Sequence, residues 1–169
     1  MPMNELERFL ETWDVETART TSLLEALPPV QYDFRPDAGG RSLGELAWHL
    51  AEVEAYISHL AKEGKLVPGE RPPGIERPRT VAELAPGYAR VHTDARARVA
   101  SLALTDLERT VTFFDGRPMV IGHLLRGALL NHLIHHRGQL SLMCRLAGGT
   151  APGLYGPNRE ETAAVRARA

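Results

Sequence analysis

The sequence predicts an all-α fold, a four-helix bundle with long crossover connections between its helices. Three observations support this prediction. Four long segments carry apolar residues at three- and four-residue spacing, residues typical of helix starts and stops bound them, and the connections are rich in proline and glycine. Connections of about 15 residues exceed the usual length between bundle helices and can cross the bundle, so neighbouring helices need not be antiparallel. With 169 residues, the chain is expected to form one domain spanning residues 1–169.

The first two helices have clear ends. The first is predicted over residues 4–26, where an apolar stripe precedes Pro28-Pro29. The second starts at a Ser-x-x-Glu capping box formed by Ser42 and Glu45, in which each side chain satisfies the other residue's free backbone N–H. Gly64 is its natural stop. Residues 64–79, with several prolines and glycines, are predicted to be a loop.

The third helix is expected to start at a second capping box, Thr80-x-x-Glu83, and to run to about Leu102. After it, apolar residues flank Asp115-Gly116, a favoured two-residue turn, which predicts a short β-hairpin or an extended loop.

The last long helix is predicted over residues 121–147, ending at Gly148-Gly149. Its inward residues are expected to be Leu125, Ala128, Leu129, His132, His136, Gln139, Leu140 and Met143. Asn158 with Glu161 could cap a short final helix.

Composition excludes several classes of function. Hydrophobic residues make up 43% and charged residues 24% of the chain, as in ordinary soluble domains. A net charge of -1 and few aromatic residues argue against a nucleic-acid partner. The sequence has no apolar run long enough for a membrane span and no signal-peptide pattern at its start. The single cysteine, Cys144, suits a reducing compartment, so a cytoplasmic location is expected.

The most informative motif is the segment NHLIHHRGQ at residues 131–139. His132 and His136 lie four residues apart on a predicted helix, so their imidazoles share a face and can reach one metal ion. His49 takes a position in the apolar stripe of the second helix. Three histidines from two helices would form an open site with a coordination position left for water or substrate. Neutral imidazoles suit zinc, nickel, iron or copper.

Alternative interpretations of these histidines exist. A lone histidine on an apolar face is more often a hydrogen-bonded core residue than a ligand, but three desolvated imidazoles without an ion or partners would be costly. His132 with His135 is also a possible pair, at i, i+3 spacing. His136 is preferred because His132 and His136 straddle the apolar stripe, whereas His135 leans towards its edge. His59, His92 and His123 are expected to be surface or flank residues, with His123 the one candidate for an extra ligand.

Several other side chains are weaker candidates. Arg137 and Tyr155 are the candidate catalytic residues: Arg137 could orient a bound water or substrate, as could Gln139, and Tyr155 could close over a pocket. A helix-surface salt bridge is the favoured role of Arg137, and packing is the alternative role of Tyr155. Glu45 or Glu52, one turn before and after His49, could accept the free imidazole N–H. Cys144 is expected to fill core space.

These motifs resemble those of a known family. Residues 132–140 (HLIHHRGQL), followed by residues 142–148, are similar to the last-helix signature of the DinB/YfiT-like metalloenzyme superfamily, and residues 42–50 (SLGELAWHL) resemble its second-helix motif. The resemblance implies an up-down-down-up helix order and a divalent metal held by His49, His132 and His136. It also implies a homodimer. Zinc or nickel is the expected ion, with iron or manganese as alternatives.

Characterised members of that family include S-transferases of bacillithiol and related thiols, and a mycothiol-dependent isomerase. The resemblance therefore implies a metal-dependent transferase whose partners are a low-molecular-weight thiol and an electrophile. Two alternatives stay open: a hydrolase that uses metal-activated water, and a non-enzymatic metal-binding dimer with a role in stress response.

Overall fold

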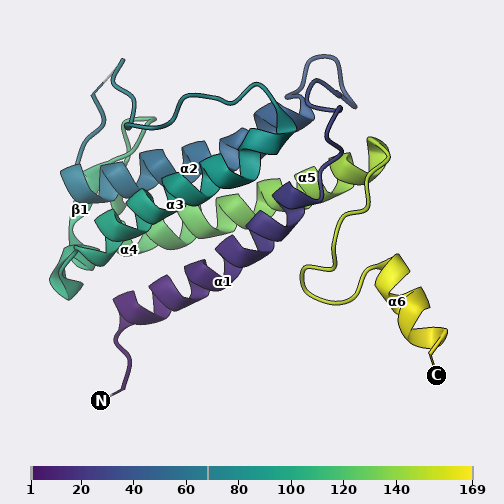
Figure 1. The fold of residues 1–169 in the computed structure, drawn as a ribbon. Coiled ribbons are helices and arrows are strands. Elements are labelled where there is room, and N and C mark those ends of the chain that lie inside the picture. Colours follow the sequence, from purple (N-terminus) through teal and green to yellow (C-terminus); the bar gives the residue numbers. More distant parts are fainter. Residues whose placement is uncertain (1, 68, 169) are drawn as a thin grey trace.

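The structure is a computed structural model that describes residues 2–67 and 69–168. Its core is a four-helix bundle, as predicted (Figure 1). Three of the bundle helices are α1 (Glu5–Glu25), α2 (Leu43–Glu63) and α3 (Leu84–Ala100). The fourth is one continuous rod made of α4 (Ile121–His123), η3 (Leu124–Asn131) and α5 (His132–Leu146).

The helix directions follow the order up, down, down, up. In Figure 1, α1 and the fourth helix run one way, whereas α2 and α3 both run the other way. Because α2 and α3 are parallel, the chain must return along the whole bundle between them. The connection from Gly64 to Thr80 does this on the outside of α2. This parallel arrangement explains the length and the proline content of that connection.

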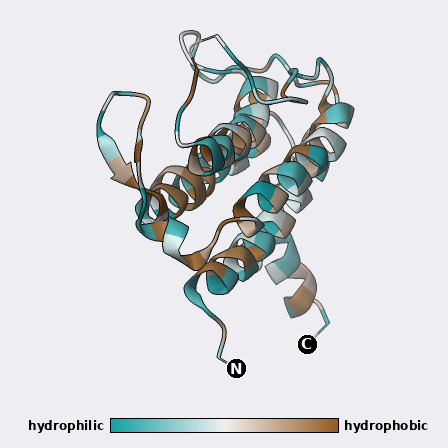
Figure 2. Cartoon of the chain, turned by 90° about the vertical axis from the view of Figure 1, so that its left-hand side faces the viewer, coloured by the Kyte–Doolittle hydropathy of each residue, from teal (hydrophilic) through white to brown (hydrophobic). Residues whose placement is uncertain are grey.

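Helix α2 is the centre of the bundle. It packs against α3 on one side and against α5 and η3 on the other, while α1 packs mainly against α3. Apolar side chains of all four helices meet in one core cluster, and the hydrophobic parts of the ribbons face inward (Figure 2). The largest fully buried side chains include Trp13, Trp48, Tyr88 and Arg137.

The ends of α2 are as predicted. Ser42 accepts a hydrogen bond from the Glu45 backbone N–H at 3.2 Å, and the Glu45 carboxylate accepts one from the Ser42 N–H at 2.8 Å. Gly64 ends the helix with a φ of 80°, a left-handed conformation that a residue with a Cβ adopts only with strain.

The capping box predicted at Thr80 is wrong. A short 3₁₀ turn, η1 (Val81–Glu83), precedes α3, and Thr80 caps no backbone N–H. Its hydroxyl donates instead to the Glu83 carboxylate at 2.6 Å. The tighter 3₁₀ turn changes the positions of the free backbone groups that a capping box needs, and sequence spacing does not reveal this change.

The predicted hairpin is present before the fourth helix. Strands β1 (Thr110–Thr112) and β2 (Pro118–Val120) pair antiparallel, with Val111 opposite Met119. The turn is longer than the expected two residues, since the Phe113 N–H donates to the Arg117 carbonyl at 2.9 Å and encloses residues 114–116. Gly116 has a φ of 83°, which is the left-handed residue that such a turn requires.

The π-helical segment η3 was not predicted from the sequence. Buried positions on the fourth helix recur every four residues from Leu125 through Leu129 and Leu133 to Arg137. A π turn holds more residues than an α turn, so four-residue spacing stays on one face there. The buried face therefore lies one residue beyond His132 and His136. The expectation that these histidines are centred on the buried stripe is wrong, because His132 is exposed and His136 is half-buried.

The final helix, α6 (Arg159–Arg166), begins at Asn158, whose side chain accepts from the Glu161 N–H at 2.7 Å, as predicted. It buries none of its residues and stands apart from the bundle in Figure 1. Among the described helices, none has both the length and the apolar composition that crossing a membrane would require.

The capping box at Ser42 and its absence at Thr80 can be tested together. Ser42→Ala should lower the free energy of unfolding by about 1 kcal/mol, because it removes the acceptor of the Glu45 N–H. Thr80→Ala is the matched control and should change it by less than about 0.5 kcal/mol, since its hydroxyl is exposed and caps no helix. Urea unfolding of both variants measures the difference; equal losses would contradict the assignment.

Candidate metal centre

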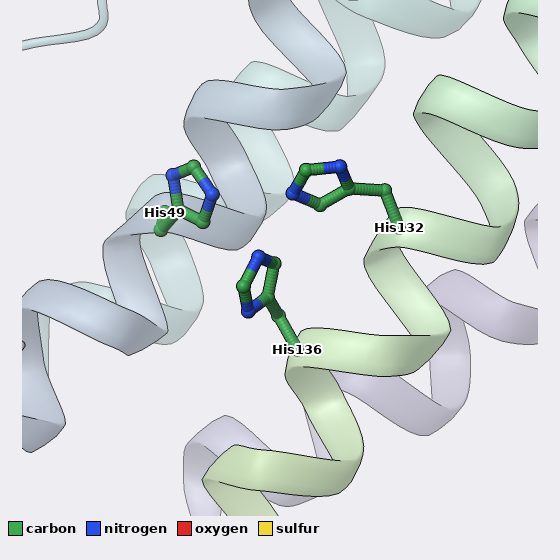
Figure 3. A group of neighbouring side chains, drawn as sticks. All are labelled: His49, His132 and His136. Carbon is green, nitrogen blue, oxygen red and sulfur yellow. The ribbon is translucent and has the colours of Figure 1, made fainter.

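Three histidines from two helices converge at one point beside the core. His49 projects from α2, and His132 and His136 project from consecutive turns of α5 (Figure 3). One ligand nitrogen of each lies within 4.8 Å of the others. The His49 ring centroid is 5.5 Å from that of His132 and 4.7 Å from that of His136. Among residues 2–67 and 69–168, this is the one group of three such side chains close enough to share an ion.

The position of this group follows from helix geometry. The i, i+4 spacing stacks His132 and His136 on one side of α5, and their ring centroids are 4.6 Å apart. The packing of α2 against α5 brings His49 opposite them. His49 and His136 are half-buried and His132 is exposed, so the cluster lies at the edge of the core and is open on one side. An open side is what a ligand-exchanging site needs.

Hydrogen bonds orient two of the three rings. His49 Nδ1 lies 3.2 Å from Glu52 Oε2, and the other Glu52 oxygen accepts from Arg77 at 3.1 Å. His136 Nδ1 lies 2.6 Å from Gln139 Oε1. Both partners are acceptors, so each Nδ1 carries the proton and each Nε2 keeps its lone pair. Of the two glutamates considered from the sequence, Glu52 is the partner of His49.

The surroundings favour neutral imidazoles. Burial lowers the pKa of His136 to about 4, partly opposed by the hydrogen bond that His136 donates to Gln139, and the neighbouring histidines lower it further. Burial is also the main reason that the pKa of His132 is lowered, with His49, His135 and Arg41 adding to it. Burial alone would raise the pKa of Glu52, but its bonds to His49 and Arg77 outweigh that effect and lower it. At neutral pH, His132 and His136 are therefore neutral donors beside an ionised carboxylate.

A cavity of about 260 Å³ opens next to the histidines. His49, His132, Glu52 and Arg41 form its polar wall. The rest of the lining is apolar: Val53, Tyr56, Ile57, Phe113, Phe114 and Ala128. The hairpin after α3 supplies both phenylalanines, and Phe114 is 59% exposed at the tip. The two aromatic rings of Tyr56 and Phe114 lie edge to face with centroids 6.4 Å apart.

The other two histidines considered as ligands lie outside the cluster. His135 is exposed, and its ring centroid is 5.0 Å from that of His136, yet it does not converge with the other three. His123, on α4, is exposed and also lies outside the group.

Arg137 and Tyr155 belong to a different cluster. Arg137 is 1% exposed and forms an ion pair with the Glu16 carboxylate on α1. It also donates to the Glu16 carbonyl at 2.8 Å, and Tyr155 donates to the same carboxylate at 2.6 Å. The surface salt bridge expected for Arg137 is therefore wrong. The structure joins Arg137 and Tyr155 to each other and to Glu16, and their hydrogen bonds do not involve the histidine cluster.

A third polar cluster, centred on Glu54, was not predicted from the sequence. Glu54 is fully buried in α2 and accepts from Trp13 at 2.9 Å and from Tyr88 at 2.6 Å. His92 Nδ1 lies 2.8 Å from its other oxygen, so of the two positions expected for His92, surface or flank, it takes the flank. The sequence did contain an indication of this buried carboxylate. Glu54 lies four residues after Leu50, at a position of the apolar stripe of α2, where a glutamate is expected to be buried and hydrogen-bonded. The cluster joins α1, α2 and α3.

Comparison with known proteins identifies the family of this four-helix bundle. Residues 12–140 match the model of the DinB superfamily. The protein is a member of the DinB superfamily.

Several relatives are similar over most of their length. An uncharacterized protein of Bacillus subtilis, YrdA, is 33% identical over 161 residues, which covers 94% of this chain and 92% of that protein. The crystal structure of a DinB-like protein from Bacillus cereus is 30% identical with a TM-score of 0.71, covering 87% of this chain and 95% of its own. A DinB-like protein of B. subtilis, YjoA, supports the fold alone, with 23% identity, a TM-score of 0.70, and 90% and 99% coverage.

The buried pair of Arg137 and Glu16 should act on stability. Arg137→Ala should lower the free energy of unfolding by about 2 kcal/mol or more, because the Glu16 carboxylate would keep only Tyr155 and the partly exposed Arg19 as partners. Arg126→Ala is the control, since Arg126 pairs with Glu5 on the surface and should contribute less than about 1 kcal/mol. Urea unfolding compares the two; a small effect of Arg137→Ala would contradict a structural role.

The lowered pKa of His136 predicts how acid affects the metal-free protein. The unfolded chain takes up this proton near pH 6.5 and the folded chain only near pH 4, so stability falls as the pH drops through that interval. His136→Gln should reduce this pH dependence of unfolding. Nuclear magnetic resonance of the His136 ring protons measures the folded pKa directly, and a midpoint near 6.5 would contradict the burial argument.

Proposed function

We propose that this protein binds a divalent metal ion through His49, His132 and His136 and uses it to transfer a low-molecular-weight thiol, of the bacillithiol type, to an electrophile. The proposal rests on the chemistry of the donors, on the cavity beside them, and on membership of the DinB superfamily.

The donor set fits such an ion. Tetrahedral coordination at 2.0–2.1 Å requires ligand nitrogens about 3.3 Å apart. The three nitrogens lie within 4.8 Å of one another, so small rotations of the side chains bring them to that spacing. Three imidazole ligands favour zinc or nickel, with iron or manganese as alternatives, and three protein ligands leave a position for substrate.

A bound divalent ion would act as a Lewis acid that lowers the pKa of a thiol to near neutrality. The residues of the chain would prepare the site for it. Glu52 and Gln139 fix the tautomers of His49 and His136, so that each presents Nε2. The apolar side chains of the cavity would seat the organic part of the substrate and exclude water from the reacting atoms.

Hydrolysis by metal-activated water is the alternative function. A bound divalent ion would lower the pKa of water as well as that of a thiol, so the donor set is compatible with both nucleophiles. Among the described residues, Glu52 is the one carboxylate that lines the cavity, and its bonds to His49 and Arg77 leave it poorly placed to assist water as a general base. We prefer thiol transfer because characterised members of the DinB superfamily include S-transferases.

The ligand set is tested by comparing adjacent histidines. His136→Ala should weaken zinc binding at least about a hundredfold, because loss of a ligand should exceed the 10–100-fold loss that follows removal of its hydrogen-bond partner. His135→Ala is the matched control and should retain full binding, since His135 lies outside the cluster. Elemental analysis after dialysis measures both. Equal metal contents would eliminate the proposed ligand set.

The reaction is tested with monochlorobimane as electrophile and bacillithiol or cysteine as thiol. The zinc- or nickel-loaded protein should accelerate the fluorescent conjugation, chelation should abolish the acceleration, and returned metal should restore it. Acceleration that persists without metal contradicts the mechanism. Thiol-independent hydrolysis of a p-nitrophenyl ester that requires the same metal would favour the hydrolase alternative instead.

A further inference from the structure

We infer that the substrate of this site carries an oxyanionic group, a carboxylate or a phosphate, which Arg71, Arg77 and Arg79 bind in a second cavity beside the histidines. As an account of the substrate, this inference rests on the proposed function, and it adds the chemical class that the substrate must belong to.

The two cavities are adjacent. The second, of about 470 Å³, is lined by Glu52, Tyr56, Ile75 and the three arginines. Glu52 and Tyr56 also line the cavity that contains His49 and His132. A molecule that extends from the histidines past Tyr56 therefore reaches the arginines.

The second cavity carries uncompensated positive charge. Three guanidinium groups face one carboxylate, Glu52, which leaves a net charge of +2 on the lining. Arg77 lies 3.1 Å from a Glu52 oxygen and 3.8 Å from a Glu45 oxygen. Within the described part of the chain, Arg71 and Arg79 form no ion pair. Guanidinium groups bind carboxylates and phosphates in preference to other ligands, because two parallel N–H donors match two oxygens.

The segment that carries Arg77 and Arg79 is held in place. The Trp48 indole N–H donates to the Ile75 carbonyl at 3.1 Å, and the Tyr32 hydroxyl donates to the Pro78 carbonyl at 2.5 Å. The Ile75 side chain is itself buried in the core. Two anchors to the bundle on either side of Arg77 give this loop a fixed path. The Arg77 and Arg79 guanidinium groups therefore start from an anchored backbone, which lowers the entropy cost of ordering them on binding.

An aromatic side chain stands beside Glu52 where the two cavities meet. Tyr56 lines both cavities, and Phe114, which lines the histidine cavity, is 59% exposed. A large exposed aromatic side chain over a cavity indicates a ligand with apolar surface. The expected substrate class is a small molecule with an apolar or aromatic body and one oxyanionic end.

The test uses three probes that differ only in their polar end: 3-phenylpropionate, 2-phenylethyl phosphate and the neutral 3-phenylpropanamide. Their dissociation constants are measured by titration calorimetry with the full chain, both metal-free and zinc-loaded. We expect at least one anionic probe to bind about tenfold or more tightly than the amide, because a hydrogen bond to a charged group is worth about one decade or more of affinity. The tighter of the two anions identifies the oxyanion.

Two variants and a control test whether the arginines cause the tighter binding of the anionic probe. Arg71→Gln and Arg79→Gln should each remove most of the advantage of the anionic probe and leave the amide unaffected. Arg166→Gln, on the exposed helix α6, should keep the advantage. Equal binding of anion and amide, or an advantage that survives both substitutions, overturns the inference.

Zinc content of the same samples separates this result from the proposed function. A chain that binds no zinc but shows the arginine-dependent preference would refute the metal centre and leave the anion site intact. A chain that binds zinc without the preference would refute the anion site alone.

Discussion

The arrangement of the whole site depends on the packing of α2 against the fourth helix. This contact sets the 4.7 Å separation between the His49 and His136 rings, which no local sequence feature controls. It is maintained by apolar burial on the inner faces of both helices, including Leu50, Leu133 and Leu140, all of which are fully buried. A shift of one helix along the other by a single turn, about 5.4 Å, would separate the three imidazoles.

The π-helical segment determines which residues of the fourth helix face the core. Four-residue spacing of buried positions through η3 turns the inner face towards Leu133 and Arg137 and leaves His132 and His136 at its edge. π-helical turns occur often at functional sites. Here the segment directly precedes the turn that carries His132.

Two buried charged clusters fix α1 relative to the other helices. Glu16 of α1 pairs with Arg137 of α5, and Trp13 of the same helix donates to Glu54 of α2. Buried charges are costly unless they are fully hydrogen-bonded, and each carboxylate here has several donors. Because these bonds are directional, they select one rotation of α1, whereas apolar packing alone tolerates neighbouring ones. The same two helices, α2 and α5, carry the histidine cluster, so these bonds also help to fix the positions of the histidines.

The sequence by itself determined the four helices, the ends of α2, the hairpin, and the residues of the histidine cluster. These features depend on local rules: 3.6-residue periodicity, the Ser42 cap, the Gly64 stop, and the i, i+4 spacing of His132 and His136. Only the tertiary structure decided that Arg137 is buried, that His92 contacts the buried Glu54, that His132 is exposed, and that Arg71 and Arg79 line a cavity next to the histidines. Each of these features depends on contacts between residues far apart in the chain or on the phase of a π turn. Neither long-range contacts nor a π turn can be recognised from the spacing of residues in the sequence.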